Sequence, residues 1–537
     1  MSKAILAIIT ITIVFLKMTS GQTKEPVLYH HNPDLRQKEL VKQLGQSGLS
    51  YGLYANEGEV EVINMLPDFS YAGYKGGGVA IPDLAATVTL EPKEGNNRER
   101  IQEAIDQVSS MPLNANGFRG KVLLKTGTYH IGGSLNITSA GVVLAGEGQG
   151  HDGTVLIATK RSRHTLINLG DDSADPSIQK QSVTPIISAY VPTGAIRFAV
   201  ESTAAYHAGD TILIQKTPNK WWVRHLKMEK YGWDPESYYI GHERIVTAVE
   251  GQHITVNIPV VDPVKQVEGG GRIYRVVCNR QTKNSGIEKI RLVSEYDHEE
   301  DEEHAWYGIK LAMAENCWVR EVTSQYFGSS AVTIDKASAF NTIEDCAMLE
   351  PMAKTKGRRK YSFFIQSGSF NLIQRCYTLG GRHDYVTGSK VSGPNVFLDS
   401  YAEGATSDIG PHLKWATGTL FDNIKGGNLR VRNRKSSGSG HGWAGAQTML
   451  WNCVSTSAKG MTCESPPGYT NWMVGGQAQQ FVGNGFKTLS RTEAAPRSLY
   501  LAQLKARLGD EAIKRVSSRK QRANTIYVEV SKLATGS

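Results

Sequence analysis

The sequence has 537 residues and a formal net charge of +9. A chain of this length usually contains several domains unless it is built from repeats. The moderate positive excess suits an acidic partner. We expect no nucleic-acid partner, because basic clusters such as residues 354–360 come without a nucleic-acid-binding motif. The six cysteines show neither a CxxC pair nor zinc-type spacing, so we expect most of them to be buried small apolar residues, although Cys453 and Cys463 lie close enough in sequence to form a disulfide.

The N-terminus has the pattern of a secretory signal. Lys3 is followed by an apolar run at residues 4–16 and then by the small residues Thr19-Ser20-Gly21. The run is too short to span a bilayer comfortably, which disfavours a membrane anchor. We expect residues 1–21 to be removed, and the loss of Lys3 and Lys17 would lower the formal charge from +9 to +7. The mature protein is therefore expected to be secreted or periplasmic, with no membrane attachment.

Residues 22–184 are expected to form an N-terminal cap and the first coils of a larger stack. Residues 97–108 predict an amphipathic helix with Ile101, Ala104, Ile105 and Val108 on one face. Short strand-like runs punctuated by Gly and Ser follow it. A solenoid needs such a cap over its open apolar end.

Residues 185–280 interrupt this pattern. The segment is rich in aromatic residues, including Trp221, Trp222 and Trp233, and it predicts a β-rich insertion packed beside the stack.

Residues 281–488 contain a repeat. Short runs of alternating polarity carry apolar anchors with successive spacings of 24, 30, 24, 24 and 29 residues, and Ile287 extends the series upstream by 32. The anchors are Val319, Ile343, Ile373, Phe397, Phe421 and Leu450. About this many residues make one coil of a β-solenoid, and the varying length indicates loops of different size on one face. We expect the anchors to point inward and to stack in one column.

Residues 489–537 predict a C-terminal helix and a last strand. Leu501, Leu504 and Leu508 have helical periodicity, and residues 526–530 read as a strand lying on the solenoid.

Three segments together resemble a known superfamily. They are Ile101-Gln-Glu-Ala-Ile-Asp, Gly127-Thr-Tyr and Val142-Val-Leu-Ala-Gly-Glu-Gly. They look like the opening of the pectin-lyase-like superfamily of right-handed parallel β-helices, and the resemblance covers roughly residues 60 to 480. It implies an all-β chain: a right-handed parallel β-helix with an N-terminal capping helix, a β-rich insertion and a C-terminal helix packed on the solenoid. It leaves the reaction open, because that superfamily contains lyases, hydrolases, isomerases and non-catalytic tailspike proteins.

Reactive side chains are densest between Arg358 and Trp443. His383, His412 and His441 are each 29 residues apart, which places them on adjacent coils if the repeat is real. Such a column suits β-elimination of a uronic-acid polysaccharide, which needs a base, an acid and a group that neutralises the carboxylate. The expected catalytic residues are His383, Tyr385, His412, Lys414 and Arg382. We expect His383 or His412 to be the base and Tyr385 the proton donor, with Lys414 and Arg382 neutralising the substrate carboxylate. The expected substrate-binding residues are Arg358, Arg359, Trp415, Arg432, Arg434, His441 and Trp443, with Trp415 or Trp443 stacking on a sugar ring.

Two alternatives remain open. Glycoside hydrolysis needs two carboxyl groups across the scissile bond, and Asp384, Asp399 and Asp408 are available. Gly440-His-Gly matches one short element of polygalacturonase-type hydrolases, but their other elements are not evident. The other is a non-catalytic polysaccharide-binding or adhesive β-helix, which predicts aromatic platforms without a proton-transfer pair.

We predict no metal or other cofactor. Three histidines could suit zinc, but Arg382, Lys414 and Arg434 nearby would repel a cation. A calcium ion is not indicated, because the acidic run at residues 297–303 is typical of a solvated loop. The expected partner is an anionic polysaccharide substrate.

Overall fold

The computed structural model describes residues 30–31, 40–44, 48–173, 176–277, 280, 282–488 and 491–535. The expected leader at residues 1–21 lies outside the described residues, as does Cys278. Within these ranges, the helices are too short or too polar to cross a membrane.

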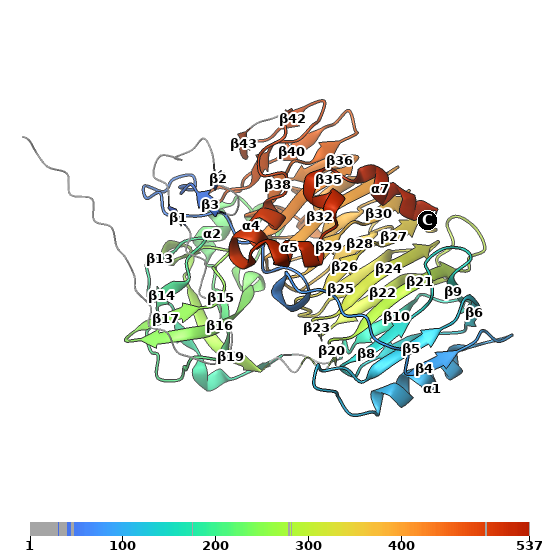
Figure 1. The fold of residues 1–537 in the computed structure, drawn as a ribbon. Helices are drawn as coiled ribbons and strands as arrows, with labels where there is room; N and C mark the ends of the chain where they lie inside the picture. Colours follow the sequence, from blue (N-terminus) through green and yellow to red (C-terminus); the bar gives the residue numbers. More distant parts are fainter. Residues whose placement is uncertain are drawn as a thin grey trace, which may run out of the picture.

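The predicted repeat is a stack of parallel coils. Each anchor pairs in register with the anchor of the next coil, from Ile287↔Val319 to Phe421↔Leu450. The column continues beyond the predicted range, to Leu144 before Ile287 and to Met473 after Leu450. All six anchors are buried. The single inward column is confirmed, and the chain is a right-handed parallel β-helix (Figure 1).

Each coil has three sides, and the strands on each side form a parallel sheet. Sheet 1 contains β4 (Val88–Leu90), β5 (Gly120–Leu124), β8 (Val142–Ala145), β21 (Gly286–Ser294), β24 (Trp318–Gln325), β26 (Thr342–Glu344), β29 (Leu372–Gln374), β32 (Asn395–Glu403), β35 (Thr419–Gly426), β38 (Met449–Trp451), β41 (Trp472–Val474) and β43 (Phe486–Thr488). Sheet 2 contains β6 (Gly127–Ile131), β9 (Thr154–Ala158), β27 (Ala347–Leu349), β30 (Tyr377–Leu379) and β39 (Val454–Ser455), joined by the second halves of β21, β24, β32 and β35.

Sheet 3 is the ten-stranded sheet that carries the candidate site. Its strands are β7 (Leu135–Ile137), β10 (His164–Gly170), β22 (Ala305–Ala312), β25 (Ser330–Asp335), β28 (Phe363–Ile365), β31 (Tyr385–Thr387), β33 (Asp408–Pro411), β36 (Asn428–Val431), β40 (Met461–Cys463) and β42 (Phe481–Val482). Side chains alternate along these strands, so that Phe363 and Ile365 enter the core while Phe364 points away from it.

Polar ladders and buried thiols fill the coil interior at its corners. The Asn341 side chain donates to Asn371, and Asn371 donates to Asn395, at 2.9 and 3.2 Å. Cys453 and Cys463 are both free and buried, so the disulfide considered between them is not formed. The five described cysteines are all buried, which confirms their expected role as small apolar residues.

The N-terminal end of the stack is covered by helix α1 (Arg98–Ser109). The four predicted apolar residues are buried against the first coils, which confirms the capping helix.

The insertion is an antiparallel sheet with its own core beside the stack (Figure 1). Its main strands are β11 (Ser177–Ile178), β14 (Arg197–Ala199), β15 (Thr211–Lys216), β16 (Gly241–Glu250), β17 (His253–Val256) and β19 (Gly271–Val277), and helix α2 (Lys220–His225) follows β15. Trp222 of α2 packs edge-on against Trp415 of the stack, with ring centroids 4.9 Å apart. The aromatic residues that distinguished the insertion in the sequence therefore join it to the solenoid.

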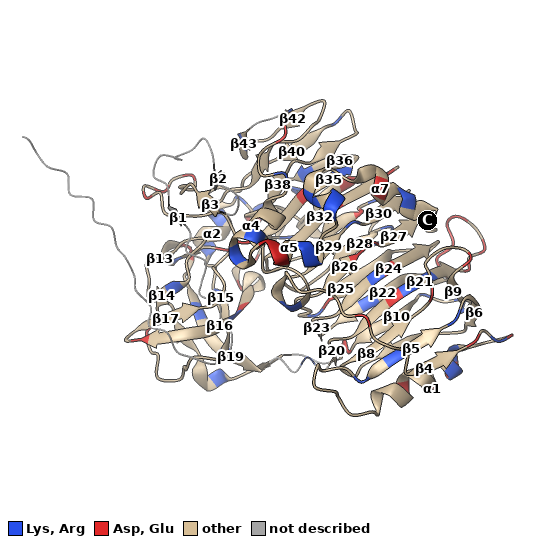
Figure 2. Ribbon diagram, in the orientation of Figure 1, with Lys and Arg blue, Asp and Glu red and all other residues tan. Residues whose placement is uncertain are grey.

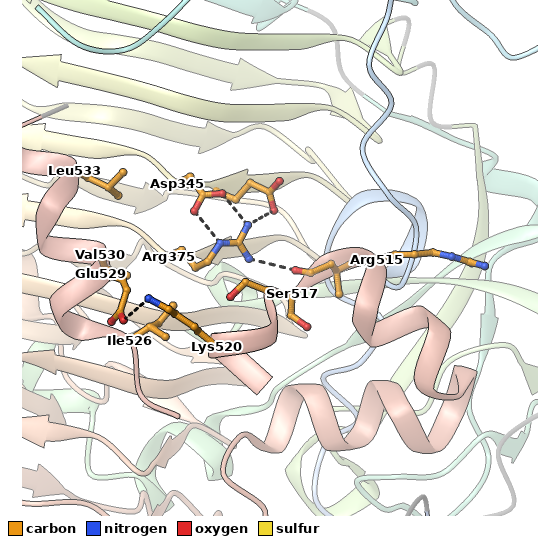
Figure 3. Close-up of a pocket in the computed structure, with 12 residues that line it drawn as sticks. Asp345, Arg375, Arg515, Ser517, Lys520, Ile526, Glu529, Val530 and Leu533 are labelled. Atoms are coloured by element: carbon orange, nitrogen blue, oxygen red, sulfur yellow. Dashed lines mark hydrogen bonds and ion pairs between the residues drawn. The ribbon is translucent and has the colours of Figure 1, made fainter. Parts of the chain in front are cut away.

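Four short helices end the described chain: α4 (Leu499–Leu508), α5 (Asp510–Val516), α6 (Arg519–Ala523) and α7 (Tyr527–Ser531). Helix α4 packs on the outward face of sheet 1, and α7 packs on the outward face of sheet 2. The strand expected at residues 526–530 is wrong, because this segment is α7. Figure 3 shows Arg375 of the stack pointing toward Asp345 and toward the end of α5, where it donates to the Val516 carbonyl oxygen.

Candidate active site

The outward face of sheet 3 is the polar side of the stack. Outward residues that pair across its strands include Asn168, Lys310 and Thr333. Asp408 and Arg430 lie on the same face toward the other end. Figure 2 shows basic and acidic residues interspersed over the coils rather than separated. Local geometry, rather than overall charge, must therefore locate a site.

The three histidines stand in a column on this face. His383 lies two residues before β31, His412 follows β33, and His441 follows the short helix α3 (Ser437–Gly440). The ring centroids of His383 and His412 are 4.1 Å apart, and those of His412 and His441 are 5.5 Å apart. The expected placement on adjacent coils is confirmed.

The contacts of His383 fix its tautomer. Its Nδ1 lies 2.6 Å from the backbone carbonyl oxygen of Asp408 and 3.2 Å from the Oδ1 of the same residue. A carbonyl oxygen only accepts hydrogen bonds, so Nδ1 carries the proton. The other nitrogen, Nε2, is buried and has no partner among the described residues. Neutral His383 therefore presents an unengaged lone pair at Nε2.

Asp408 is an ionised carboxylate held by cations. Its Oδ2 accepts hydrogen bonds from Arg432 at 3.0 Å and from Arg434 at 2.9 Å. Burial alone would raise its pKa, but the hydrogen bond from His383 and the charge of Arg434 hold the pKa well below the usual range. Asp408 thus orients His383 and would stabilise its protonated form.

Tyr361 belongs to the site, although the sequence analysis did not include it. Its hydroxyl group lies 3.0 Å from His412 Nε2. Its ring is edge-on to both imidazoles, at 5.2 Å from His383 and 5.3 Å from His412. Tyr361 precedes β28 by two residues, as His383 precedes β31, and this shared offset is the signal that could have found it.

Burial keeps the imidazoles neutral at neutral pH. Burial lowers the pKa of His383 despite the opposing effect of Asp408. Burial, together with the charges of His383 and Arg434, lowers the pKa of His412 far below the usual range. Burial and the charges of Arg434 and Lys414 lower the pKa of His441 to about 4. All three rings are therefore neutral at pH 7.

Tyr385 does not belong to the site. Its side chain is in the core of the solenoid, stacked on Phe363. Its hydroxyl donates to the carbonyl oxygens of Cys376 and Tyr401. It is fully buried on the inward side of sheet 3, so its assignment as a proton donor is wrong.

The two tryptophans proposed as sugar platforms face the insertion. Trp415 is 1% exposed and packs edge-on against Trp222 and Tyr469, so it cannot stack on a sugar. Trp443 is half-buried beside the same cluster, and its indole nitrogen donates to the Leu226 carbonyl oxygen. Both residues instead join the insertion to the stack.

Of the basic residues expected to bind substrate, some lie beside the histidine column and one is paired elsewhere. Arg382 lies over the Tyr361 ring at 6.0 Å, and Arg432 keeps 31% of its side chain exposed beside Asp408. Arg358 is exposed on the preceding loop. Arg359 instead pairs with Glu302 and lies over Trp306, so its guanidinium group is already engaged away from the column.

The three candidate acids are not equivalent. Asp399 lies on sheet 1 and is paired with Arg497, so it cannot act with Asp408. Asp384 and Asp408 occupy equivalent positions on neighbouring coils, because each lies two residues before one member of the Val386↔Gly410 pair. Asp384 is buried, accepts a hydrogen bond from Ser362 at 2.5 Å, and has its pKa raised by burial to about 6.

His383, Asp408 and His412 offer ligand atoms within 4.8 Å of one another, which is close enough to hold a metal ion. However, a cation there would lie beside the Arg432 and Arg434 guanidinium groups, which already neutralise the carboxylate. The donor set therefore fits a proton-transfer site better than a metal site. In the acidic run at residues 297–303, Asp301 pairs with Arg161.

Comparisons with known proteins give a likeness of fold alone. No family model and no curated protein matches the chain. Among solved structures, the tailspike protein gp49 from Pseudomonas phage LKA1 has 15% identity and a TM-score of 0.43, over 72% of this chain and 55% of the tailspike. An alginate lyase from Paenibacillus sp. str. FPU-7 has 10% identity and a TM-score of 0.38, over 75% of this chain and 100% of the lyase. Pectate lyase Pel9A has 6% identity and a TM-score of 0.34, over 81% of this chain and 85% of that one. The chain spans between 55% and 60% of the first three structures it matches.

Proposed function

We propose that this protein is a secreted polysaccharide-degrading enzyme that cleaves a uronic-acid polysaccharide by β-elimination on the outward face of sheet 3. The observation that carries the proposal is His383, a neutral imidazole with a free Nε2 lone pair, set beside the Tyr361 ring and beside Asp408, to which two guanidinium groups are bound. The similar structures include an alginate lyase and a pectate lyase, and their likeness to this chain is one of fold.

His383 is the general base in this proposal. Its Nε2 takes the C5 proton of the uronate, and the Asp408 carboxylate stabilises the imidazolium that forms. The electron pair released at C5 forms the C4–C5 double bond, and the C4–O4 bond breaks.

Tyr361 is the general acid, in place of Tyr385. Its hydroxyl group gives its proton to the departing O4, and His412, hydrogen-bonded to the same oxygen, holds the hydroxyl in position. Arg382, Arg432 and Arg434 neutralise the substrate carboxylate, which makes the C5 proton more acidic.

His383 and His412 are 1% and 6% exposed, whereas Arg432, which is paired with Asp408 beside them, keeps 31% of its side chain exposed. A bound carboxylate would have to draw Arg432 or Arg434 partly away from Asp408. We therefore expect substrate binding and the release of Asp408 from its arginine partners to be linked.

A second candidate is glycoside hydrolysis, favoured by one observation. Asp384 and Asp408 stand on neighbouring strands with opposite pKa shifts, as an acid and a base require. Against it, Asp408 is already bound by His383 and two arginines, and Asp384 is buried and hydrogen-bonded to Ser362.

The test is turnover by variants on polygalacturonate, alginate and hyaluronan. Ultraviolet absorbance of unsaturated uronate and reducing ends are followed together. We expect His383→Ala and Tyr361→Phe to lower kcat by about 10²- to 10⁴-fold. His207→Ala, which removes an exposed imidazole of the insertion, is the control and should leave kcat unchanged. Near-wild-type turnover in both site variants would refute the assignment.

A further inference from the structure

A cavity lies between the insertion and the stack, at the His441 end of the histidine column. Its volume is about 230 Å³. The insertion contributes Asp234, Ser237 and Tyr238, and the stack contributes Lys390, Lys414 and His441. Neither part of the molecule makes this cavity alone.

The cavity contains unsatisfied polar groups. The Tyr238 side chain is 2% exposed, and its hydroxyl group has no hydrogen-bond partner among the described residues. The Nδ1 of His441 is likewise buried and without a partner in the described chain. Buried polar groups are normally paired, and the two residues that carry these unpaired groups both line the cavity, which favours a polar occupant over an apolar one.

The charge of the cavity favours an anion. Its lining includes two lysines, Lys390 and Lys414, and one acidic residue, Asp234. The Lys390 ammonium donates to the Ser237 carbonyl oxygen at 2.9 Å, which ties the two walls together. Lys414 is thus the cation better placed to receive a carboxylate.

The cavity continues the proposed active site. The His441 ring lies next to that of His412, with ring centroids 5.5 Å apart, and Lys414 follows His412 by two residues. Pockets for drug-sized ligands span roughly 300–1,000 Å³, so a smaller cavity suits a single sugar ring.

We infer that this cavity is a subsite for one acidic sugar residue of the substrate, with Lys414 binding its carboxylate and Tyr238 and Ser237 binding its hydroxyl groups. The inference rests on the proposed function for the substrate class. It gives the insertion a role in specificity, because the insertion supplies the Tyr238 and Ser237 contacts.

The test is a titration of the intact protein with galacturonate, glucuronate and mannuronate, with methyl galactoside as the neutral probe, followed by NMR. At least one hexuronate should bind more tightly than methyl galactoside. Lys414→Met should weaken that binding by about tenfold or more, as expected for loss of a charge-assisted hydrogen bond, and Lys414→Arg should restore part of it. Ser237→Trp should block the cavity, and Lys459→Met, at an exposed turn, should change nothing.

The outcomes separate this inference from the proposed function, because the titration does not require turnover. Hexuronate binding that depends on Lys414 would support the subsite even if no polysaccharide is cleaved. Binding that neither Lys414→Met nor Ser237→Trp affects, or no binding of any hexuronate, would overturn it. Unchanged KM and product lengths in Ser237→Trp would also overturn it, and would leave the β-elimination proposal standing.

Discussion

At the centre of the site, the Asp408 residue controls His383 through two different groups. Its backbone carbonyl oxygen holds the Nδ1 proton, and its carboxylate supplies negative charge next to the same ring. Removing the carboxylate therefore leaves the tautomer in place but withdraws the charge that stabilises the imidazolium.

This separation predicts the pH profile. The pKa of His383 is lowered by burial, so the neutral base persists below the usual histidine range and is lost only as pH falls through the lowered pKa. In the pH profile of kcat/KM, the fall on the acid side, called the acid limb, should then lie below about pH 6.5.

Asp408→Asn should move that limb to still lower pH, because the carboxylate raises the pKa of His383. It should also lower the rate by less than the roughly 10⁴-fold that follows loss of a sole orienting carboxylate. Asp335→Asn, on the same face of another coil, is the control. A limb that shifts to higher pH would contradict the assigned contact.

At the scale of elements, the C-terminal helices are fastened to sheet 1 by buried charge. Arg497 makes two hydrogen bonds to Asp399, at 2.7 and 2.9 Å, and the Asp399 side chain is fully buried. Asp422 accepts hydrogen bonds from Ser498 and from the Tyr500 backbone at the start of α4. Asp399, one of the three candidate acids, thus serves attachment rather than catalysis, and Asp422 serves attachment beside it.

Removing one partner of the buried Arg497–Asp399 pair should destabilise the fold. Arg497→Ala should lower the free energy of unfolding by about 3–5 kcal/mol, because it leaves the Asp399 charge buried and unpaired. The double variant Asp399→Leu with Arg497→Leu should recover most of the loss. Urea denaturation measures both, and a loss below about 1 kcal/mol for the single variant would show that the pair does not fasten the helices.

Helix α7 shows where local pattern misled. Residues 526–530 alternate between apolar and other residues, which is typical of a strand. In the structure, Ile526 and Val530 are the buried positions, and a spacing of four fits one face of a helix. A segment of only five residues fits both the alternation of a strand and the spacing of a helix. Its packing on sheet 2 therefore determines which of the two structures forms.

At the scale of the whole molecule, the length of each coil was predictable because neighbouring coils follow one another in the sequence. Each anchor must pair with the anchor one coil away, and that requirement leaves a spacing in the sequence. The histidine column followed from the same register. The role of Tyr361, the burial of Tyr385 and the burial of Trp415 were not predictable, because they depend on which side of a strand faces inward and on where the insertion packs.

Stacking also predicts how mutations combine. Phe397 and Phe421 are stacked on adjacent coils, with centroids 5.0 Å apart, and each Phe→Ala change should cost about 3–5 kcal/mol. The double variant should be non-additive, whereas Phe421→Ala combined with Ile287→Ala, several coils away, should be additive within about 0.5 kcal/mol. Equal coupling in both pairs, measured by denaturant unfolding, would contradict nearest-neighbour stacking.

The central claim is cleavage by elimination at His383 and Tyr361, and the mass of the products tests it most directly. Digestion of acidic polysaccharides followed by mass spectrometry should give oligosaccharides whose new non-reducing end is one water lighter than a saturated uronate. These products should disappear in His383→Ala. Saturated products of full mass that depend on Asp384 would contradict the account and assign the site to a hydrolase.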